Sequence, residues 1–244
     1  KIESELKSNQ VKILKLCRYT DILTPKFKKS GTTYKILKTI CESDVERIII
    51  TTKGCPDYSI LGLIREYPQK FSFNVAAKPF SGVTFEPYST PLKKRLDGAV
   101  KAMEAGAKVT IHMDPIVTGL EDTEEVLVPF LEDLKQRGLN RVMFSYLLLS
   151  GDIINNMRKT IDNETMDKIL SHYILDDSIQ CLPSQTETTY FFPSPEARTK
   201  SVSTISGLLN KMGFEFVLCS IKNDPDSIQV SEKTCPSCDA SFYA

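Results

Sequence analysis

The fold is decided by one stretch, RIIITTKG at residues 47–54. Its centre is β-branched and apolar at consecutive positions, which is typical of a strand buried on both faces of a parallel sheet. Gly54 stops the run, and Lys53 stands at its carboxyl end. The stretch therefore predicts an interior strand of an α/β sheet that ends in a charged side chain.

The same alternation of short β runs and amphipathic helices continues on both sides of this stretch. Further strand-like runs lie at residues 11–17, 71–76, 108–114, 141–149, 178–182 and 214–219, and Pro115 is expected to break the run at 108–114. Helical patterns separate them at residues 32–40, 60–64, 91–105, 123–137, 152–172 and 195–212, and Gly106 is expected to close the third. The pattern at residues 152–172 fits one helix or two. Successive βαβ units of this kind predict parallel strands with right-handed crossovers.

A closed or partial α/β barrel is favoured over a doubly wound sheet, because no Gly-rich phosphate turn follows the first strand. Ile2 and Leu6 indicate a helix ahead of that strand, so we expect the barrel to lack its first strand in this chain. We assign residues 1–222 to the barrel domain. Residues 223–244 form a polar tail that carries Cys235-x-x-Cys238.

Composition narrows the class of protein. Of 244 residues, 41% are apolar and 25% charged, as in a folded globular chain. Lys+Arg 31 balance Asp+Glu 31, which argues against a polyanionic sheath or membrane surface as the main partner. No apolar run approaches the roughly 18 residues that span a bilayer, so no membrane partner is expected. Seven scattered cysteines favour a reducing, cytoplasmic location over a disulfide scaffold.

Polar residues at the expected carboxyl ends of the strands carry a resemblance, because barrel chemistry sits at that edge. Taken in order and spacing, they resemble the radical SAM barrel, in its spore photoproduct lyase-like branch. The residues concerned are Tyr19-Thr20-Asp21 with Pro25, Thr51-Thr52-Lys53, Glu86-Pro87 with Pro91 and Arg95-Leu96, and Gly106 before Asp114-Pro115-Ile116.

The resemblance implies S-adenosylmethionine and a 4Fe-4S cluster as cofactors, which together generate a 5′-deoxyadenosyl radical. It implies that Lys53 pairs with the carboxylate of the methionyl group and that Asn74 lies near the same ligand. Asp114 would contact this ligand or the substrate, and Thr20 and Asp21 would belong to the cofactor site. Nucleic acid is one candidate substrate, and the implied electron donor is a flavodoxin or ferredoxin.

The cysteine pattern departs from that family. No CxxxCxxC occurs in the chain, so the cluster ligands are expected upstream of Lys1 or are absent. Cys235 and Cys238 supply half of a tetrahedral metal shell, with no second pair nearby in the sequence. We name these two cysteines as candidate metal ligands, with an ordinary polar tail as the default interpretation.

Two other classes of function stay open. A barrel that has lost its cluster would act as a binding or scaffold subunit. An aldolase-like enzyme would use Lys53 as Schiff-base former and Asp114 as proton-transfer partner. Simpler roles also compete, because Lys53 could run its stem along the barrel rim and Asp114 could serve only a turn.

Overall fold

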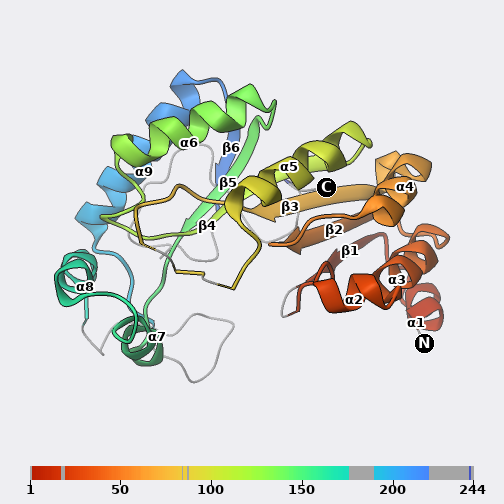
Figure 1. Cartoon of the computed structure of the whole chain (residues 1–244), viewed down its shortest axis with the longest axis horizontal. Coiled ribbons are helices and arrows are strands. Elements are labelled where there is room, and N and C mark those ends of the chain that lie inside the picture. The colour runs from red at the N-terminus through yellow and green to blue at the C-terminus, as the bar shows by residue number, and fades with distance from the viewer. Residues whose placement is uncertain are drawn as a thin grey trace.

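A computed structural model describes residues 2–17, 20–83, 85–86, 88–175, 190–219 and 242 (Figure 1). The strands are β1 (Ile13–Leu16), β2 (Arg47–Thr52), β3 (Phe71–Ala76), β4 (Lys108–Ile116), β5 (Arg141–Tyr146) and β6 (Glu215–Leu218). The helices are α1 (Ile2–Ser8), α2 (Pro25–Lys29), α3 (Thr32–Cys41), α4 (Tyr58–Glu66), α5 (Leu92–Glu104), α6 (Glu124–Gln136), α7 (Gly151–Met157), α8 (Asn163–Leu170) and α9 (Pro195–Lys211).

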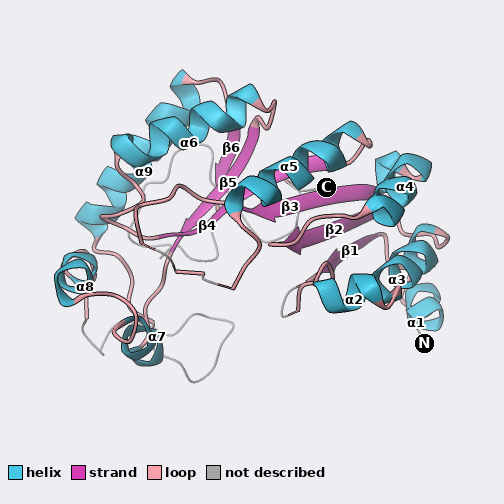
Figure 2. Cartoon of the chain, viewed as in Figure 1, coloured by secondary structure: helices cyan, strands magenta, loops and turns pink. Residues whose placement is uncertain are grey.

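The six strands form one open, fully parallel sheet in the order β1-β2-β3-β4-β5-β6. Spatial order therefore follows chain order, as repeated βαβ units require. This arrangement confirms the parallel α/β partial barrel expected from the alternation of β runs and helices (Figure 2). The run expected at residues 178–182 lies outside the described residues.

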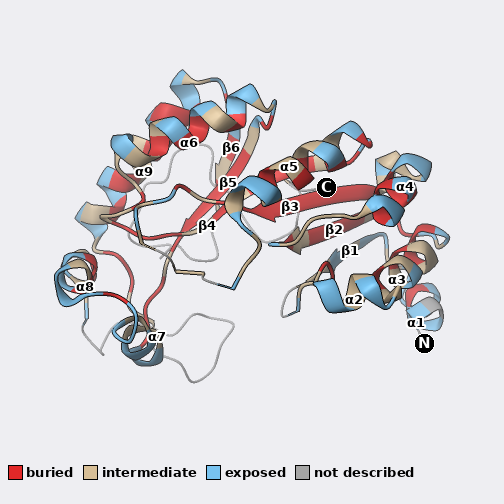
Figure 3. Cartoon of the chain, viewed as in Figure 1, coloured by how far each residue is buried: buried red, intermediate tan, exposed pale blue. Residues whose placement is uncertain are grey.

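Helices cover one face of this sheet, which we call the outer face. Alternate strand residues point into the helical layer, among them Ile50, Phe73 and Ile111, and all three are fully buried. Helices α3, α4, α5, α6 and α9 are each buried on one side and exposed on the other (Figure 3). The apolar residues at every second strand position thus pack against the apolar faces of the helices in one hydrophobic core.

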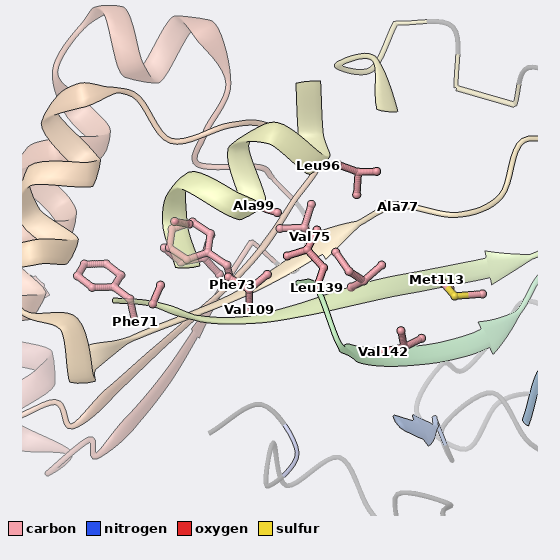
Figure 4. Close-up of a cluster of buried hydrophobic side chains, with 14 of the residues drawn as sticks. Phe71, Phe73, Val75, Ala77, Leu96, Ala99, Val109, Met113, Leu139 and Val142 are labelled. Atoms are coloured by element: carbon pink, nitrogen blue, oxygen red, sulfur yellow. The ribbon is translucent and has the colours of Figure 1, made fainter. Parts of the chain in front are cut away.

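Helix α5 shows how this packing works. Leu96 and Ala99 project from α5 toward Phe73 and Val75 of β3 (Figure 4). Gly106 follows the helix with φ of 106°, a conformation that favours glycine, and an added Cβ would come within 2.6 Å of Pro68 Cβ. The predicted stop at Gly106 is confirmed, and it returns the chain directly into β4.

The prediction that Pro115 breaks the fourth strand was wrong. β4 continues to Ile116 through a cis Asp114–Pro115 peptide bond, and its register against β5 shifts between Met113 and Ile116. The irregularity accommodates the proline because Pro lacks the N–H that a regular ladder would use.

After β4, one strand boundary differs from the expectation, and the helical segment takes the form of two helices that was one of its two expected forms. β5 ends at Tyr146, and Leu149 instead pairs with Phe191 in an isolated antiparallel bridge. The segment 152–172 is two helices, α7 and α8, because Asp162 accepts a hydrogen bond from Thr165 N and starts a new helix. These helices lie beyond the end of β4 (Figure 1) and surround a small separate core that includes Ile169.

The proposed domain boundary at residue 222 falls outside the described residues and stays a prediction. Among the described helices, none combines the length and apolar character needed to cross a bilayer.

Candidate functional site

A chain of charges lies at the carboxyl ends of β2 and β3. Lys53 Nζ is 2.5 Å from Glu86 Oε1, and Glu86 Oε2 is 3.4 Å from Arg95 Nη1. Arg95 Nη1 also donates to the Ala76 carbonyl at 2.6 Å, which fixes the guanidinium to the end of β3. One carboxylate therefore joins a lysine on the second strand to an arginine on the helix after the third.

Glu86 is held in its charged form by these neighbours. Burial raises the pKa of Glu86, but the hydrogen bond and charge of Lys53, with Arg95 and Lys78 behind them, outweigh it. The net result is a pKa below the ordinary glutamate value. The Lys53 side chain is 46% exposed, so a ligand can approach it from solvent.

Asp21 fixes the backbone that carries Lys53. Its carboxylate accepts hydrogen bonds from Thr52 Oγ1 at 2.8 Å and 2.9 Å, from Lys53 N at 2.8 Å and from Leu23 N at 2.8 Å. Thr52 Oγ1 in turn accepts from Gly54 N at 2.8 Å. Asp21 thus ties the segment after β1 to the end of β2, which is a positioning role for Lys53.

Asn74 lies on the inner face, the face of the sheet opposite the helices. Thr51, Asn74 and Thr110 are register partners on β2, β3 and β4, so their side chains form a row on one face. Asn74 and Thr110 are fully buried. Asn74 Nδ2 donates to Thr51 Oγ1 at 3.5 Å, whereas Asn74 Oδ1 and Thr110 Oγ1 have no hydrogen-bond partner among the described residues.

Buried polar atoms without partners are costly, and proteins retain few of them. Lys53 stands two positions beyond Thr51, the register partner of Asn74, which corresponds to about 7 Å along a strand. The structure therefore brings Lys53 and Asn74 to the same end of neighbouring strands, where Asn74 Oδ1 and Thr110 Oγ1 lack a hydrogen-bond partner within the described ranges.

Asp114 lies elsewhere on the inner face. It stands four positions beyond Thr110 on β4, about 13 Å further along the strand. Ser145 Oγ donates to Asp114 Oδ1, and His112 Nε2 is 3.6 Å from Asp114 Oδ2. The structure joins Asp114 to His112 and Ser145, and its contact with the ligand or the substrate stays a prediction.

The remaining predicted residues are placed as follows. Thr20 is exposed beside Asp21. Cys235 and Cys238 lie outside the described residues, so their assignment as metal ligands stays a prediction.

The described cysteines do not form a metal or cluster site. Cys17, Cys41, Cys55 and Cys219 are free thiols, and no group of three His, Cys, Asp or Glu side chains within the described ranges is arranged to hold a metal ion. Burial raises the pKa of Cys17 to about 11 and that of Cys41 to about 12. Burial thus disfavours the thiolate form of these two cysteines, which is the form that ligates a cluster.

Sequence analysis did not assign Glu86 and Arg95 to the site, although both contribute to the family resemblance. Glu86 contacts Lys53, and Arg95 contacts Glu86. These contacts require the loop after β3 to fold back toward β2, which no local pattern indicates. The ion pair between Lys78 and Glu121, which are 2.8 Å apart beside the same loop, was also not predicted. The available signal was the position of Lys78 two residues after the end of β3.

Together these features define an open parallel α/β barrel with a polar inner face and a charged rim. No family model and no curated protein matches the chain. Solved structures of spore photoproduct lyase, a radical SAM enzyme, do match. A doubly substituted form with bound AdoMet and dinucleoside spore photoproduct gives a TM-score of 0.68 at 14% identity, covering 89% of this chain and 65% of that chain.

A second structure, spore photoproduct lyase complexed with dinucleoside spore photoproduct, gives a TM-score of 0.62 at 14% identity, with the same coverage of 89% and 65%. The chain thus spans about two thirds of the length of these proteins. At this identity the likeness shows the fold, and it supports the resemblance inferred from the sequence at that level.

Proposed function

We propose that the chain is a radical SAM-type domain that binds S-adenosylmethionine at the carboxyl ends of β2 and β3. The observation that carries the proposal is Lys53, which Asp21 and Glu86 hold at the strand end, near buried polar atoms that have no hydrogen-bond partner in the described part of the chain. Support comes from the likeness to an AdoMet-bound structure of the same fold. Bound S-adenosylmethionine would supply an activated sulfonium carbon–sulfur bond.

The residues present fit this ligand by their chemistry. Lys53 offers an ammonium to the ligand carboxylate, and Asn74 Oδ1 offers an acceptor to its amino group or to a hydroxyl. Thr110 Oγ1 offers a hydroxyl from the next strand. These interactions would give Asn74 Oδ1 and Thr110 Oγ1 the hydrogen-bond partner that they lack among the described residues. They would also cover the partly exposed Lys53 side chain.

The described residues do not fit a 4Fe-4S cluster, because they provide no set of three thiolates. The proposal for these residues therefore ends at binding and orienting S-adenosylmethionine. Radical generation would require cluster ligands from outside the described ranges. The described residues also do not account for a nucleic-acid substrate or for a flavodoxin or ferredoxin as electron donor.

The same observation favours a second candidate, a barrel that binds its ligand without cluster chemistry. An aldolase-like enzyme gains no support. Lys53 is in an ion pair with Glu86, and Asp114 accepts a hydrogen bond from Ser145.

Calorimetric titration of the 244-residue chain with S-adenosylmethionine tests the proposal. Lys53→Ala should weaken binding at least tenfold, because the ligand carboxylate loses its counter-charge. Lys29→Ala, an exposed lysine on α2, is the matched control and should bind as the wild type does. Equal affinity in the two variants would remove Lys53 from the site, and no binding by the wild type would refute the proposal.

A further inference from the structure

One row of side chains crosses the inner face of the sheet. Asn74 and Thr110 are register partners on β3 and β4. Arg141 continues this row on β5, because the residues that follow Thr110 and Arg141 are themselves register partners. Arg141 therefore belongs to the same row as the polar atoms that are proposed to bind S-adenosylmethionine.

Arg141 contacts Phe242, which lies 101 positions later in the sequence. Arg141 Nη2 donates a hydrogen bond to the Phe242 carbonyl at 2.6 Å, and Arg141 Cζ lies 4.5 Å from the centroid of the Phe242 ring. A guanidinium is attracted to the face of an aromatic ring, and the hydrogen bond fixes the main chain beside that ring. Arg141 thus binds both the backbone and the side chain of Phe242.

The Phe242 ring also packs on apolar side chains of the inner face. Its neighbours are the cluster formed by Ile49 and Met143, which are 0% and 4% exposed. Ile49 belongs to β2 and Met143 to β5, and β3 and β4 lie between these strands. The cluster on which Phe242 packs therefore spans the two strands that carry Asn74 and Thr110.

Asn74 and Thr110 have no side-chain surface open to a ligand. Both are 0% exposed, although the described helices lie on the outer face. Their burial therefore depends on parts of the chain that pack on the inner face, as Phe242 does. In this arrangement S-adenosylmethionine cannot reach Asn74 Oδ1 or Thr110 Oγ1, so its binding requires a movement.

Phe242 is the residue best suited to that movement. Ile49 and Met143 are fixed by pairing within β2 and β5. Phe242 is half-buried and belongs to none of the described strands, and the side chain of Arg141 binds it. Segments with few buried contacts open at a lower free energy than the paired strands of a core.

We propose that Phe242 is an intramolecular latch. Bound to Arg141, it closes the inner face over Asn74 and Thr110, and S-adenosylmethionine binds when Phe242 is released. The inference rests on the proposed function and adds the control of access to that site. Because the latch lowers the fraction of chains that can bind the ligand, removing it raises the apparent affinity.

A tryptophan at the latch reports its position without any ligand. The chain contains no Trp, so all indole emission of Phe242→Trp comes from position 242. This emission should be blue-shifted relative to the same variant unfolded in urea, because the ring packs on an apolar cluster. Adding Arg141→Gln should shift it toward the unfolded value. Glu215→Gln, which removes the charge of the other partner of Arg141, is the matched control and should leave the emission unchanged.

Calorimetric titration with S-adenosylmethionine then tests the effect of the latch on binding. Phe242→Ala should bind the ligand about threefold or more tightly than the wild type does. Ile2→Ala truncates an exposed apolar residue on α1 and should bind as the wild type does. Saturating S-adenosylmethionine should shift the emission of Phe242→Trp toward the unfolded value, because the ligand and the latch compete for the inner face.

Circular dichroism checks that each variant folds, and if Phe242→Ala does not, the response of Phe242→Trp to the ligand decides. Folded Phe242→Trp that emits as the unfolded chain does overturns the latch, as does emission that saturating ligand leaves unchanged. Equal affinity of Phe242→Ala and the wild type also overturns the latch and leaves the proposed function standing. Absence of binding by both chains refutes the proposed function, and the latch with it.

Discussion

Lys53 and Glu86 are 33 positions apart in the sequence, yet their charged groups meet at 2.5 Å at the carboxyl ends of neighbouring strands. The same carboxylate reaches Arg95, which is itself bonded to the end of β3. The lysine at this site is therefore oriented before any ligand arrives. A ligand carboxylate at Lys53 must either displace Glu86 toward Arg95 or join it.

Replacing Glu86 tests how much this shared carboxylate stabilises the fold. Glu86→Gln leaves the largely buried Arg95 guanidinium without its counter-charge, so the free energy of unfolding should fall by about 1–3 kcal/mol. Urea unfolding measures the change. Glu42→Gln, which removes the exposed Lys38–Glu42 pair, should cause no measurable loss. Equal effects of the two substitutions would show that the charge chain does not stabilise the fold.

The pH dependence of stability should also reveal Glu86. Its pKa in the folded chain lies below the ordinary value of 4.5, so its contribution is present above pH 4.5. That contribution is lost as the pH falls below 4.5 and through the folded pKa. The difference in unfolding free energy between wild type and Glu86→Gln should therefore shrink in acid, as urea titrations at a series of pH values would show.

For Glu121→Gln we expect the opposite dependence of the unfolding free-energy difference on pH. Burial raises the pKa of Glu121 in the folded chain, so the folded state binds this proton more tightly than the unfolded state. The advantage of wild type over Glu121→Gln should grow as the pH falls through the folded pKa toward 4.5. Parallel trends in the two variants would contradict the opposite environments assigned to these carboxylates.

Thr110 and Thr33 form a matched pair for the inner face, since both are fully buried threonines. Thr33 Oγ1 donates to the Ile22 carbonyl at 2.6 Å, so Thr33→Val should cost about 1–2 kcal/mol of unfolding free energy. Thr110 Oγ1 has no partner among the described residues, so Thr110→Val should be neutral or stabilising.

The same threonine variants test the ligand site. Calorimetry should show weaker S-adenosylmethionine binding by Thr110→Val and unchanged binding by Thr33→Val. A large loss of stability in Thr110→Val would mean that its hydroxyl already supports the free fold.

Asp21→Ala should loosen the end of β2. It removes the carboxylate that accepts from Thr52 Oγ1 and Lys53 N, and we expect a loss of about 2–3 kcal/mol in unfolding free energy. Amide hydrogen exchange at Lys53 should accelerate. Asp57→Ala, which removes one capping bond at α4, should cost about 1 kcal/mol and leave exchange at Lys53 unchanged. Unaltered exchange in Asp21→Ala would exclude the positioning role.

The fold was predictable because its signals are local. The apolar run at residues 47–52 identified a buried parallel strand, and Gly106 identified the end of α5. β4 was mispredicted at Pro115 because a shift in register against β5, a non-local adjustment, accommodates the proline. The split between α7 and α8 depends on Asp162, whose capping competes with an otherwise continuous helical pattern.

The candidate site was predictable only where strands dictate geometry. Lys53 and Asn74 lie on adjacent strands at known positions, so their proximity follows from parallel register. Glu86 comes from the loop after β3, where no periodicity specifies a path, and its contact with Lys53 was not predicted. Asp114 was expected to contact the ligand or the substrate from further round the barrel, and this assignment stays a prediction, with Asp114 near the end of β4.

The strand order β1 to β6 has a consequence for biosynthesis. Each strand after the first leaves the ribosome when the neighbour it pairs with has already emerged. A nascent chain can thus add one strand and one helix at a time to a growing edge, without holding an unpaired strand for a distant partner. Assembly in this direction would limit the time that the apolar strands spend exposed to other chains.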